Sequence, residues 1–392
     1  MLEKYFNNRF IVIFLTPFII GSLATLSFQP FNYTIVNFLI LPFFFYLLVH
    51  INKKSKSVYR KKPYKKNFFL TGLFFGFGFF LSGISWITNS LTFDESFKLL
   101  IPFALILVPL FLSLFMAFTT LIIGPILKLN FLSLILFSGG LAFTDYLRAK
   151  LFGGFPWNLW AYSTSWLNEI LQILNITGLY LYNLFVITFF ILPIIFFFKI
   201  NLTKKLFYFL ISFLVILFIY IYGSYEINKN KKMINKIENL VYVKIISPNF
   251  ELKYGLDKNE IENRFKKLIK FSNPNKEQKT LFIWPEGVFS GYSFNEVKLF
   301  KKLITENFSK EHIIIFGVNK LDIKSGNFFN SMVMVNNRFE IIQSYNKLKL
   351  VPFGEFLPLE PLIKKAGFKK ITEGHGSFLK GDRIGNFEID KL

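Results

Sequence analysis

Residues 99–127 read LLIPFALILVPLFLSLFMAFTTLIIGPIL, a stretch of 29 residues without a charged side chain. A helix needs about 20 such residues to cross the roughly 30 Å hydrocarbon core of a bilayer. Within lipid, backbone amides and carbonyls find no water, so a spanning segment must pair them internally. The stretch therefore predicts a transmembrane helix, even though its Phe and Ile residues would favour a strand in water.

Similar apolar runs lie on both sides of this one and predict about seven spans in residues 1–223. The expected spans are 10–27, 33–50, 68–90, 99–127, 131–147, 169–198 and 205–223. The first run has no small-residue cleavage site after it, and a second run follows closely, so we interpret it as a span and not as a signal peptide. Residues 1–223 are thus expected to form a polytopic α-helical membrane domain.

The composition of the whole chain agrees with this interpretation. Of its 392 residues, 53% are hydrophobic and 20% are aromatic, including 55 Phe, whereas 18% are charged. A typical soluble domain carries about 25% charged residues. The composition therefore excludes a disordered chain and an ordinary soluble enzyme.

The positions of lysine and arginine predict the orientation of the spans. The loop between the second and third spans, residues 51–67, contains no acidic residue and a run of basic ones, namely Lys53, Lys54, Lys56, Arg60, Lys61, Lys62, Lys65 and Lys66. Basic loops of this kind stay in the cytoplasm. A nucleic-acid-binding patch is the alternative interpretation of such a run, but the flanking spans favour the membrane. With seven crossings, everything after Gly223 is expected outside the cytoplasm.

Aromatic residues gather in a loop that this orientation places on the outer side. Phe155 and Trp157 lie in the turn GGFPWN at 153–158, Tyr162 follows it, and Trp86 lies near the end of the third expected span. Trp and Tyr prefer the membrane–water interface. These four side chains are therefore either membrane anchors or a surface that faces a lipid substrate.

The pattern changes at about residue 238, after a linker expected at 224–237. Short β-branched runs then alternate with charged amphipathic stretches, which predicts an α/β domain in residues 238–392. We expect strands at 240–246, 280–284, 312–318, 331–335 and 339–343, and helices at 258–271 and 295–308. In layered α/β domains, functional residues lie at the ends of strands.

One carboxylate follows such a strand directly, in the sequence Trp284-Pro285-Glu286-Gly287. A glutamate at the carboxyl end of a buried strand is a candidate general base. The alternative is a glutamate that caps a following helix, and this motif alone does not separate the two roles.

Two lysines near the end of the last expected strand are candidates for a fixed positive charge. Lys347 lies in an apolar setting, where an ammonium group could stabilise a developing oxyanion. Lys349 competes with it by position. Taken singly, each lysine could equally be a solvated surface charge.

The sequence contains no cysteine. Disulfides, thiolate metal ligands and thiol nucleophiles are therefore excluded within these 392 residues. The three histidines are scattered and offer neither zinc-ligand spacing nor a catalytic triad.

The segments around Glu286 and Lys347, taken together, resemble the glutamate and lysine motifs of the nitrilase superfamily. With the membrane domain before them, the chain resembles the apolipoprotein N-acyltransferase family nearly end to end. The segments that carry this resemblance are FQPF at 28–31, residues 78–86, 145–148, GFPW at 154–157, SPN at 247–249, WPEG at 284–287, NS at 330–331 and YNKLKLVPFGEFLP at 345–358.

The resemblance implies a nitrilase-like αββα sandwich, incomplete at its C-terminus, as the fold of the second domain. It implies that Glu286 is the general base, Lys347 the oxyanion-stabilising lysine and Glu355 a second active-site carboxylate, which leaves Lys349 as a bystander. Tyr254 stands where the family usually has tryptophan and would keep an aromatic face toward the substrate. The nucleophilic cysteine and a last span are expected just beyond Leu392, so we interpret the chain as a fragment or a prematurely terminated product.

The implied reaction transfers a fatty acyl group from a phospholipid to the N-terminal α-amine of diacylglyceryl-cysteine in apolipoproteins, through a thioester, as the last step of lipoprotein maturation. The resemblance implies no metal or organic cofactor. The implied location is the bacterial inner membrane, with the α/β domain on the periplasmic side. The protein is expected to be a monomer and to bind no nucleic acid. Without a cysteine, the chain as given is expected to lack the means to form the thioester. The alternatives are a membrane-tethered nitrilase-type amidase and a non-catalytic membrane fragment that binds lipid or lipoprotein.

Overall fold

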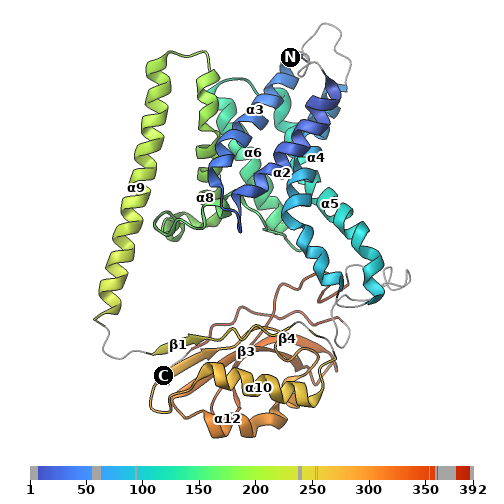
Figure 1. Ribbon diagram of the computed structural model, residues 1–392, viewed down its shortest axis with the longest axis vertical. Coiled ribbons are helices and arrows are strands. Elements are labelled where there is room, and N and C mark those ends of the chain that lie inside the picture. Colours follow the sequence, from blue (N-terminus) through green and yellow to red (C-terminus); the bar gives the residue numbers. More distant parts are fainter. Residues whose placement is uncertain are drawn as a thin grey trace. The chain divides into compact units, whose positions relative to one another are not determined.

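The structure of the protein is a computed structural model that describes residues 8–54, 63–92, 95–236, 241–251, 253, 255–352, 354–357, 360 and 377–388. Tyr254, Phe353 and Pro358 lie outside these residues. The chain divides into two compact units (Figure 1). The first comprises residues 1–89 and 99–236, and the second comprises residues 90–98 and 237–392.

The regular elements of the first unit, within its described residues, are helices. They are α2 (Thr16–Ala24), α3 (Asn37–Lys54), α4 (Pro63–Ile84), α5 (Ile101–Ile123), α6 (Phe131–Lys150), the short α7 (Asn168–Leu171), α8 (Leu174–Ile191) and α9 (Leu202–Ile234). A π-helical segment, Ile11–Leu15, precedes α2, and 3₁₀ segments extend several helices, such as Ser85–Thr92 after α4 and Leu192–Phe197 after α8.

Among the described residues, five helical segments are long and apolar enough to cross a membrane: Thr34–Lys54, Tyr64–Thr92, Phe97–Ile126, Leu174–Phe197 and Leu202–Ile234. The helical segment Ile11–Ser27 is apolar but shorter, and α6 carries charged side chains close to its C-terminal end. Helices thus occur at all seven expected positions. That Ile11–Ser27 and α6 also cross, and which side each loop faces, stay predictions.

Glycines let α4 pack closely against helices on two sides. A Cβ atom at Gly72 would lie 2.6 Å from the carbonyl oxygen of Met116 in α5. A Cβ atom at Gly78 would overlap the carbonyl oxygen of Phe18 in α2. Small residues at these positions bring the helix backbones together, which is the usual way in which transmembrane helices associate.

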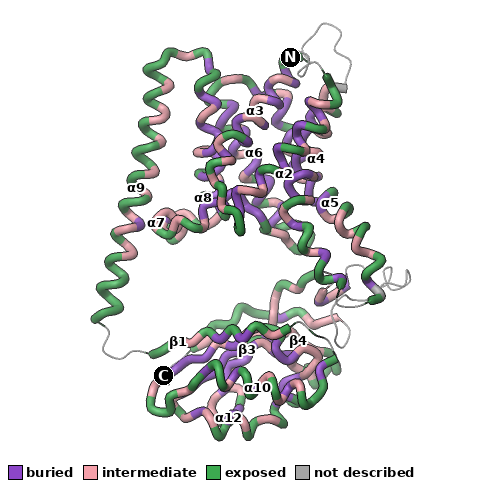
Figure 2. Tube along the Cα trace, viewed as in Figure 1, coloured by how far each residue is buried: buried purple, intermediate pink, exposed green. Residues whose placement is uncertain are grey.

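Stacked aromatic rings fill the interior of the helical unit. The rings of Phe44 and Phe75 stack with centroids 3.9 Å apart, and Phe79 stacks on Trp160 at 5.3 Å. Figure 2 shows this interior as buried, whereas α9 is exposed or partly exposed along nearly all of its length. Gly223 is the single buried residue of α9.

A five-stranded sheet forms the centre of the second unit. Its strands are β1 (Tyr242–Ile245), β2 (Thr280–Ile283), β3 (His312–Leu321), β4 (Phe328–Val335) and β5 (Ile341–Asn346), and they lie side by side in chain order. The first three strands are parallel, with Thr280 opposite both Tyr242 and His312. β4 and β5 continue the sheet in antiparallel fashion.

The helices α10 (Lys258–Ser272), α11 (Phe294–Val297) and α12 (Lys301–Asn307) belong to the same unit, and α10 and α12 cover one face of its sheet (Figure 1). A capping box starts α10, in which the Asp257 carboxylate accepts a hydrogen bond from the Glu260 amide at 2.7 Å. The apolar face of α10 is buried in a cluster with Phe282 and Phe316 of the sheet. Burial of these side chains supplies the hydrophobic driving force for the layer.

The expected strands and the helix at 258–271 are confirmed to within a few residues. The helix expected at 295–308 is divided into α11, a 3₁₀ turn at Lys298–Phe300, and α12. Helix α9 runs on to Ile234, so most of the expected linker at 224–237 is helical. One sheet with helices on one face agrees with part of a nitrilase-like domain; the complete αββα sandwich and the exact domain limits stay predictions.

Candidate functional site

Glu286 lies just beyond the carboxyl end of β2. The strand ladder continues as far as Trp284, whose amide donates to the carbonyl of Ile315 at 2.9 Å. After Pro285 and Glu286 the chain turns through Gly287, which has a φ of 72°, a value in the region that glycine adopts without strain. A Cβ atom at Gly317 of β3 would approach the Cα and Cγ atoms of Glu286 at 3.3 Å, so a glycine there leaves room for this glutamate.

Lys347 follows β5 directly, at the same edge of the sheet. Its amide donates to the carbonyl of Asn330 at 2.8 Å, and its carbonyl accepts from the amide of Gly381 at 2.9 Å. The lysine backbone is therefore fixed between β4 and the C-terminal segment 377–388. This anchoring sets the direction in which the Lys347 side chain extends toward Glu286.

Glu355 is the most firmly held member of the site. Its Oε1 accepts hydrogen bonds from the Nζ of Lys347 at 2.8 Å and from the Nδ2 of Asn330 at 2.6 Å. Its Oε2 accepts from the backbone amide of Val351 at 2.8 Å. The side chain is 11% exposed. Charge-assisted hydrogen bonds to a nearly buried carboxylate are among the stronger ones in proteins, so Glu355 orients the lysine.

Glu286 belongs to the same cluster but is held loosely. Its Oε1 lies 3.9 Å from the Nζ of Lys347 and accepts a hydrogen bond from the Nδ2 of Asn330 at 3.3 Å. The Glu286 side chain is 71% exposed and that of Lys347 31% exposed. The Glu355 carboxylate is thus held against the lysine by hydrogen bonds, whereas the Glu286 carboxylate is largely exposed to solvent. In such an arrangement the Glu286 carboxylate can accept a proton, and the neighbouring Lys347 ammonium group can stabilise a negative charge.

The structure brings together three of the residues singled out in the sequence, Glu286, Lys347 and Glu355. Lys349 is exposed, two positions further along the chain. Asn330, which bonds both carboxylates, was not recognised as a site residue. Its place in the Asn330-Ser331 segment of the family resemblance was the one signal that could have found it. Tyr254 lies outside the described residues.

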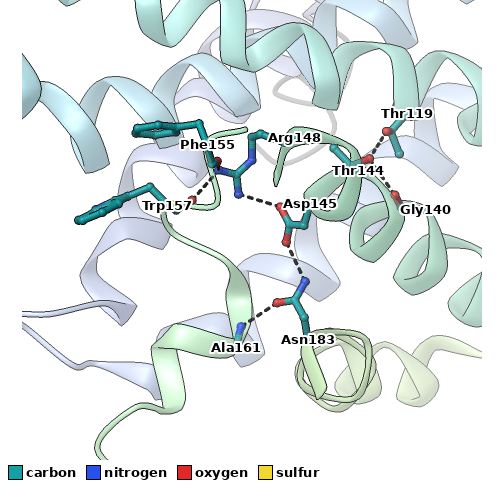
Figure 3. Close-up of polar contacts among 9 residues, drawn as sticks. All are labelled: Thr119, Gly140, Thr144, Asp145, Arg148, Phe155, Trp157, Ala161 and Asn183. Atoms are coloured by element: carbon teal, nitrogen blue, oxygen red, sulfur yellow. Dashed lines mark hydrogen bonds and ion pairs between the residues drawn. The ribbon is translucent and has the colours of Figure 1, made fainter. Parts of the chain in front are cut away.

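A second polar cluster is buried in the helical unit and holds the aromatic loop (Figure 3). Asp145 and Arg148 of α6 form an ion pair of 3.0 Å whose side chains are each 1% exposed. The Nη1 atom of Arg148 donates to the carbonyls of Phe155 and Trp157, both at 2.6 Å. One guanidinium therefore fixes the path of the loop.

Asn183 of α8 completes this cluster. Its Nδ2 donates to the Oδ2 of Asp145 at 2.9 Å, and its Oδ1 accepts from the amide of Ala161 at 2.8 Å. The asparagine ties α6, α8 and the segment after the loop into one network. Nothing in the sequence pattern marked Asn183, because a lone polar residue within an apolar helix carries no motif.

The four aromatic residues expected to face lipid lie at this loop or beside it. The rings of Trp86 and Trp157 approach with centroids 5.1 Å apart, and Phe155 stacks on Trp157 at 6.2 Å. Trp86, Trp157 and Tyr162 are exposed, and Phe155 is half-buried. They thus form an open aromatic surface, and whether it faces a substrate stays a prediction.

Among the described residues, no group of three or more His, Cys, Asp or Glu side chains has the arrangement of a metal site.

Comparison with known proteins gives consistent matches along the chain. A family model described as the apolipoprotein N-acyltransferase N-terminal domain matches residues 20–192. The apolipoprotein N-acyltransferase of Rhodopseudomonas palustris is 26% identical over 383 residues, which cover 94% of this chain and 70% of that protein. The enzyme of that name from Brucella suis is 26% identical over 390 residues, covering 94% and 69%. The one from Rickettsia typhi is 28% identical over 370 residues, covering 93% and 70%.

Proposed function

We propose that the chain is a member of the apolipoprotein N-acyltransferase family and that it acts in the transfer of a fatty acyl group from a phospholipid to the N-terminal amine of a lipoprotein. The proposed acceptor is the α-amine of a diacylglyceryl-cysteine. The matches to acyltransferases along both units support this function over a tethered amidase or a non-catalytic lipid binder.

The observation that carries the proposal is the cluster of Glu286, Lys347 and Glu355. Its open carboxylate lies 3.9 Å from an ammonium group that a second carboxylate holds at 2.8 Å. We assign Glu286 as the general base, because its exposed side chain can reach an incoming group. We assign Lys347 as the charge that stabilises the oxyanion, with Glu355 and Asn330 as positioning residues.

The proposed reaction has two half-reactions. A thiol gives its proton to Glu286, its sulfur bonds to the acyl carbonyl carbon, and the ester C–O bond breaks as the lysophospholipid oxygen takes that proton. The acceptor amine then bonds to the thioester carbon, the C–S bond breaks, and Glu286 passes the amine proton to the leaving sulfur. In both steps Lys347 faces the negatively charged carbonyl oxygen.

The thiol in this scheme is not supplied by the 392 residues, since they contain no cysteine. The carboxylate that would deprotonate it is open to solvent, at 71% exposure. A small thiol from solution can therefore approach Glu286, and this offers a direct way to examine the residues that are present.

The proposed setting is the inner membrane of a bacterium, with the sheet unit on the periplasmic side and the chain as a monomer. Within the described part of the chain, five helices with the length and hydropathy of membrane spans support the membrane location. The basic residues at 53–66 support a cytoplasmic position for the loop after α3. We propose that Trp86, Phe155, Trp157 and Tyr162 face the lipid substrates, because both donor and acceptor are anchored in the bilayer.

The test uses the 392-residue chain in phospholipid nanodiscs with a diacylglyceryl-cysteine peptide and a small thiol such as N-acetylcysteamine. We expect N-acylated peptide, measured by mass spectrometry, to form only when the thiol is present. Glu286→Gln and Lys347→Met should each remove this product, whereas the exposed Glu277→Gln should not. Absence of product at every thiol concentration, or equal product from the Glu286→Gln variant, would overturn the proposal.

A further inference from the structure

Helix α9 is attached to the rest of the helical unit near its N-terminal end. The ring of Phe209 stacks on Phe196 with centroids 4.9 Å apart, and Tyr208 stacks on Phe131 at 4.8 Å. In addition, the Nζ of Lys205 donates to the carbonyl of Phe196 at 2.7 Å. These contacts fix the first two turns of the helix.

A second attachment lies further along α9, at Gly223. A Cβ atom at this glycine would overlap the carbonyl oxygen of Glu169 in α7, so the two backbones touch. Gly223 lies fourteen positions after Phe209, which at 1.5 Å per residue is roughly 20 Å. Between the two attachments no residue of α9 is buried.

A groove with a volume of about 640 Å³ lies between these two attachments. Its walls come from α8 and the middle of α9, with aromatic and aliphatic side chains such as Phe185, Phe189, Val215, Ile216 and Ile219. The volume lies in the range of ligand sites in proteins, about 300–1,000 Å³. Both helices have the hydropathy of membrane spans, so the medium that reaches the groove is hydrocarbon.

One end of the groove is polar. There the Oγ1 of Thr34 donates to the carbonyl of Ser163 at 2.6 Å and accepts from the Nε1 of Trp166 at 2.8 Å. The hydroxyls of Thr164 and Tyr182 are hydrogen-bonded at 2.6 Å. The Oδ1 of Asn32, which also lines the groove, is buried and accepts no hydrogen bond from the described residues. This end therefore includes a buried acceptor that no described residue uses.

We propose that this groove is a binding site for one phospholipid, with an acyl chain between α8 and α9 and the head group at the end formed by Asn32, Thr34 and Trp166. A length of roughly 20 Å suits a chain that reaches to about the middle of a 30 Å hydrocarbon core. An apolar channel with one polar end matches an acyl chain joined to a polar head. An unfilled groove would forfeit the dispersion contacts of its walls.

The Oδ1 atom of Asn32 distinguishes between phospholipid head groups with and without hydrogen-bond donors on their nitrogen. The ammonium group of phosphatidylethanolamine carries N–H donors that can reach the Oδ1 of Asn32, whereas the choline head of phosphatidylcholine carries none. The groove residues lie in the helical unit, and none belongs to the Glu286 cluster. The inference therefore concerns the helical unit alone and does not depend on the proposed acyl transfer.

The test uses the full chain in nanodiscs that contain a phosphatidylethanolamine with a photoactivatable diazirine at the end of one acyl chain. We expect cross-links at groove positions of α8 and α9, such as Phe189 and Val215, and not at the outward residues Phe213 and Phe218. Ile216→Trp, which fills the groove, should lower the yield about tenfold, because the indole displaces the volume of about two methylene groups. Leu217→Trp, one position away and outside the lining, is the matched control.

Three outcomes would overturn the proposal. One is equal labelling of groove and outward faces of α9, which indicates surrounding bulk lipid only. Another is an unchanged yield in Ile216→Trp with a folded protein, judged by its thermal transition against that of Leu217→Trp. The third is a phosphatidylcholine probe of the same chain length that labels the groove as well as the phosphatidylethanolamine probe does.

Discussion

The Nζ atom of Lys347 lies 3.9 Å from the Oε1 atom of Glu286, although β3, β4 and β5 separate the two residues along the chain. The same ammonium group is 2.8 Å from Glu355. The lysine therefore serves two carboxylates of different character, one nearly buried and one open. This difference is the basis for separating a chemical role from an orienting role by mutation.

Replacing the open carboxylate should remove proton transfer without unfolding the protein. We expect Glu286→Gln to lower thiol-dependent acyl transfer by about 10²–10⁴-fold, the usual contribution of a general base. The rate is measured by mass spectrometry of the acylated peptide. The fold should be unaffected, because the side chain is 71% exposed. A rate within twofold of the wild-type rate would exclude Glu286 as the base.

The Glu355 carboxylate should contribute to the stability of the sheet unit and not to proton transfer. Glu355→Ala leaves the Lys347 ammonium, the Asn330 amide and the Val351 N–H without their acceptor. We expect a loss of about 1–3 kcal/mol in the free energy of opening of β4 and β5. Amide hydrogen exchange of peptides from these strands measures it. Glu286→Ala is the matched control and should change this free energy by less than about 0.5 kcal/mol.

The buried ion pair of the helical unit should be costly to break. Arg148→Met leaves the Asp145 carboxylate and the carbonyls of Phe155 and Trp157 without their charged partner. We expect a loss of about 3–5 kcal/mol, as for other buried pairs from which one partner is removed. Thermal unfolding in detergent provides the measurement. Lys98→Met, which breaks the exposed pair with Glu95, should cost no more than about 1 kcal/mol.

His312 should make the sheet unit sensitive to acid. Burial lowers the pKa of His312 below its ordinary value. The neutral ring accepts from the Ser309 amide at 3.1 Å and donates to the Asn275 carbonyl at 2.8 Å. Since the unfolded chain then binds the proton more readily, this contribution to stability is complete above about pH 6.5 and is lost as the pH falls through the folded pKa.

The matching measurement is the midpoint of urea unfolding of the chain in detergent, compared between pH 7.5 and pH 5.5. His312→Phe retains the ring contacts with Phe282 and Phe308 but binds no proton. Its midpoint should be lower at pH 7.5 because two hydrogen bonds are lost, and it should fall less between the two pH values. Equal falls in both proteins would contradict the assignment.

Two helical glycines should respond to alanine in opposite directions. A Cβ atom at Gly223 of α9 would overlap the Glu169 carbonyl oxygen, whereas one at Gly139 of α6 would meet nothing within 4 Å. We expect Gly139→Ala to stabilise the protein by up to about 1 kcal/mol through helix propensity. Gly223→Ala should lower the thermal transition and raise hydrogen exchange in α9. Stabilisation by both changes would show that the contact with Glu169 is not close in the membrane.

The sequence by itself determined the elements of this protein, because those depend on local patterns. Long apolar runs predicted the helices of residues 1–223, and alternating short runs predicted the five strands to within a few residues. The segments that contain Glu286, Lys347 and Glu355 were recognisable as motifs. The division of 295–308 into α11 and α12 was missed, since a 3₁₀ turn there leaves the hydrophobic pattern almost unchanged.

Only the tertiary structure decided which side chains meet. Asn330 bonds both carboxylates because the pairing of β4 with β3 and β5 brings it to the edge where β2 ends. Asn183 joins Asp145 because α8 packs on α6. The groove lies where α9 is held at Phe209 and Gly223 while none of the residues between them is buried. Hydrogen bonds and packing between residues far apart in sequence depend on register and close approach, and no local pattern records either.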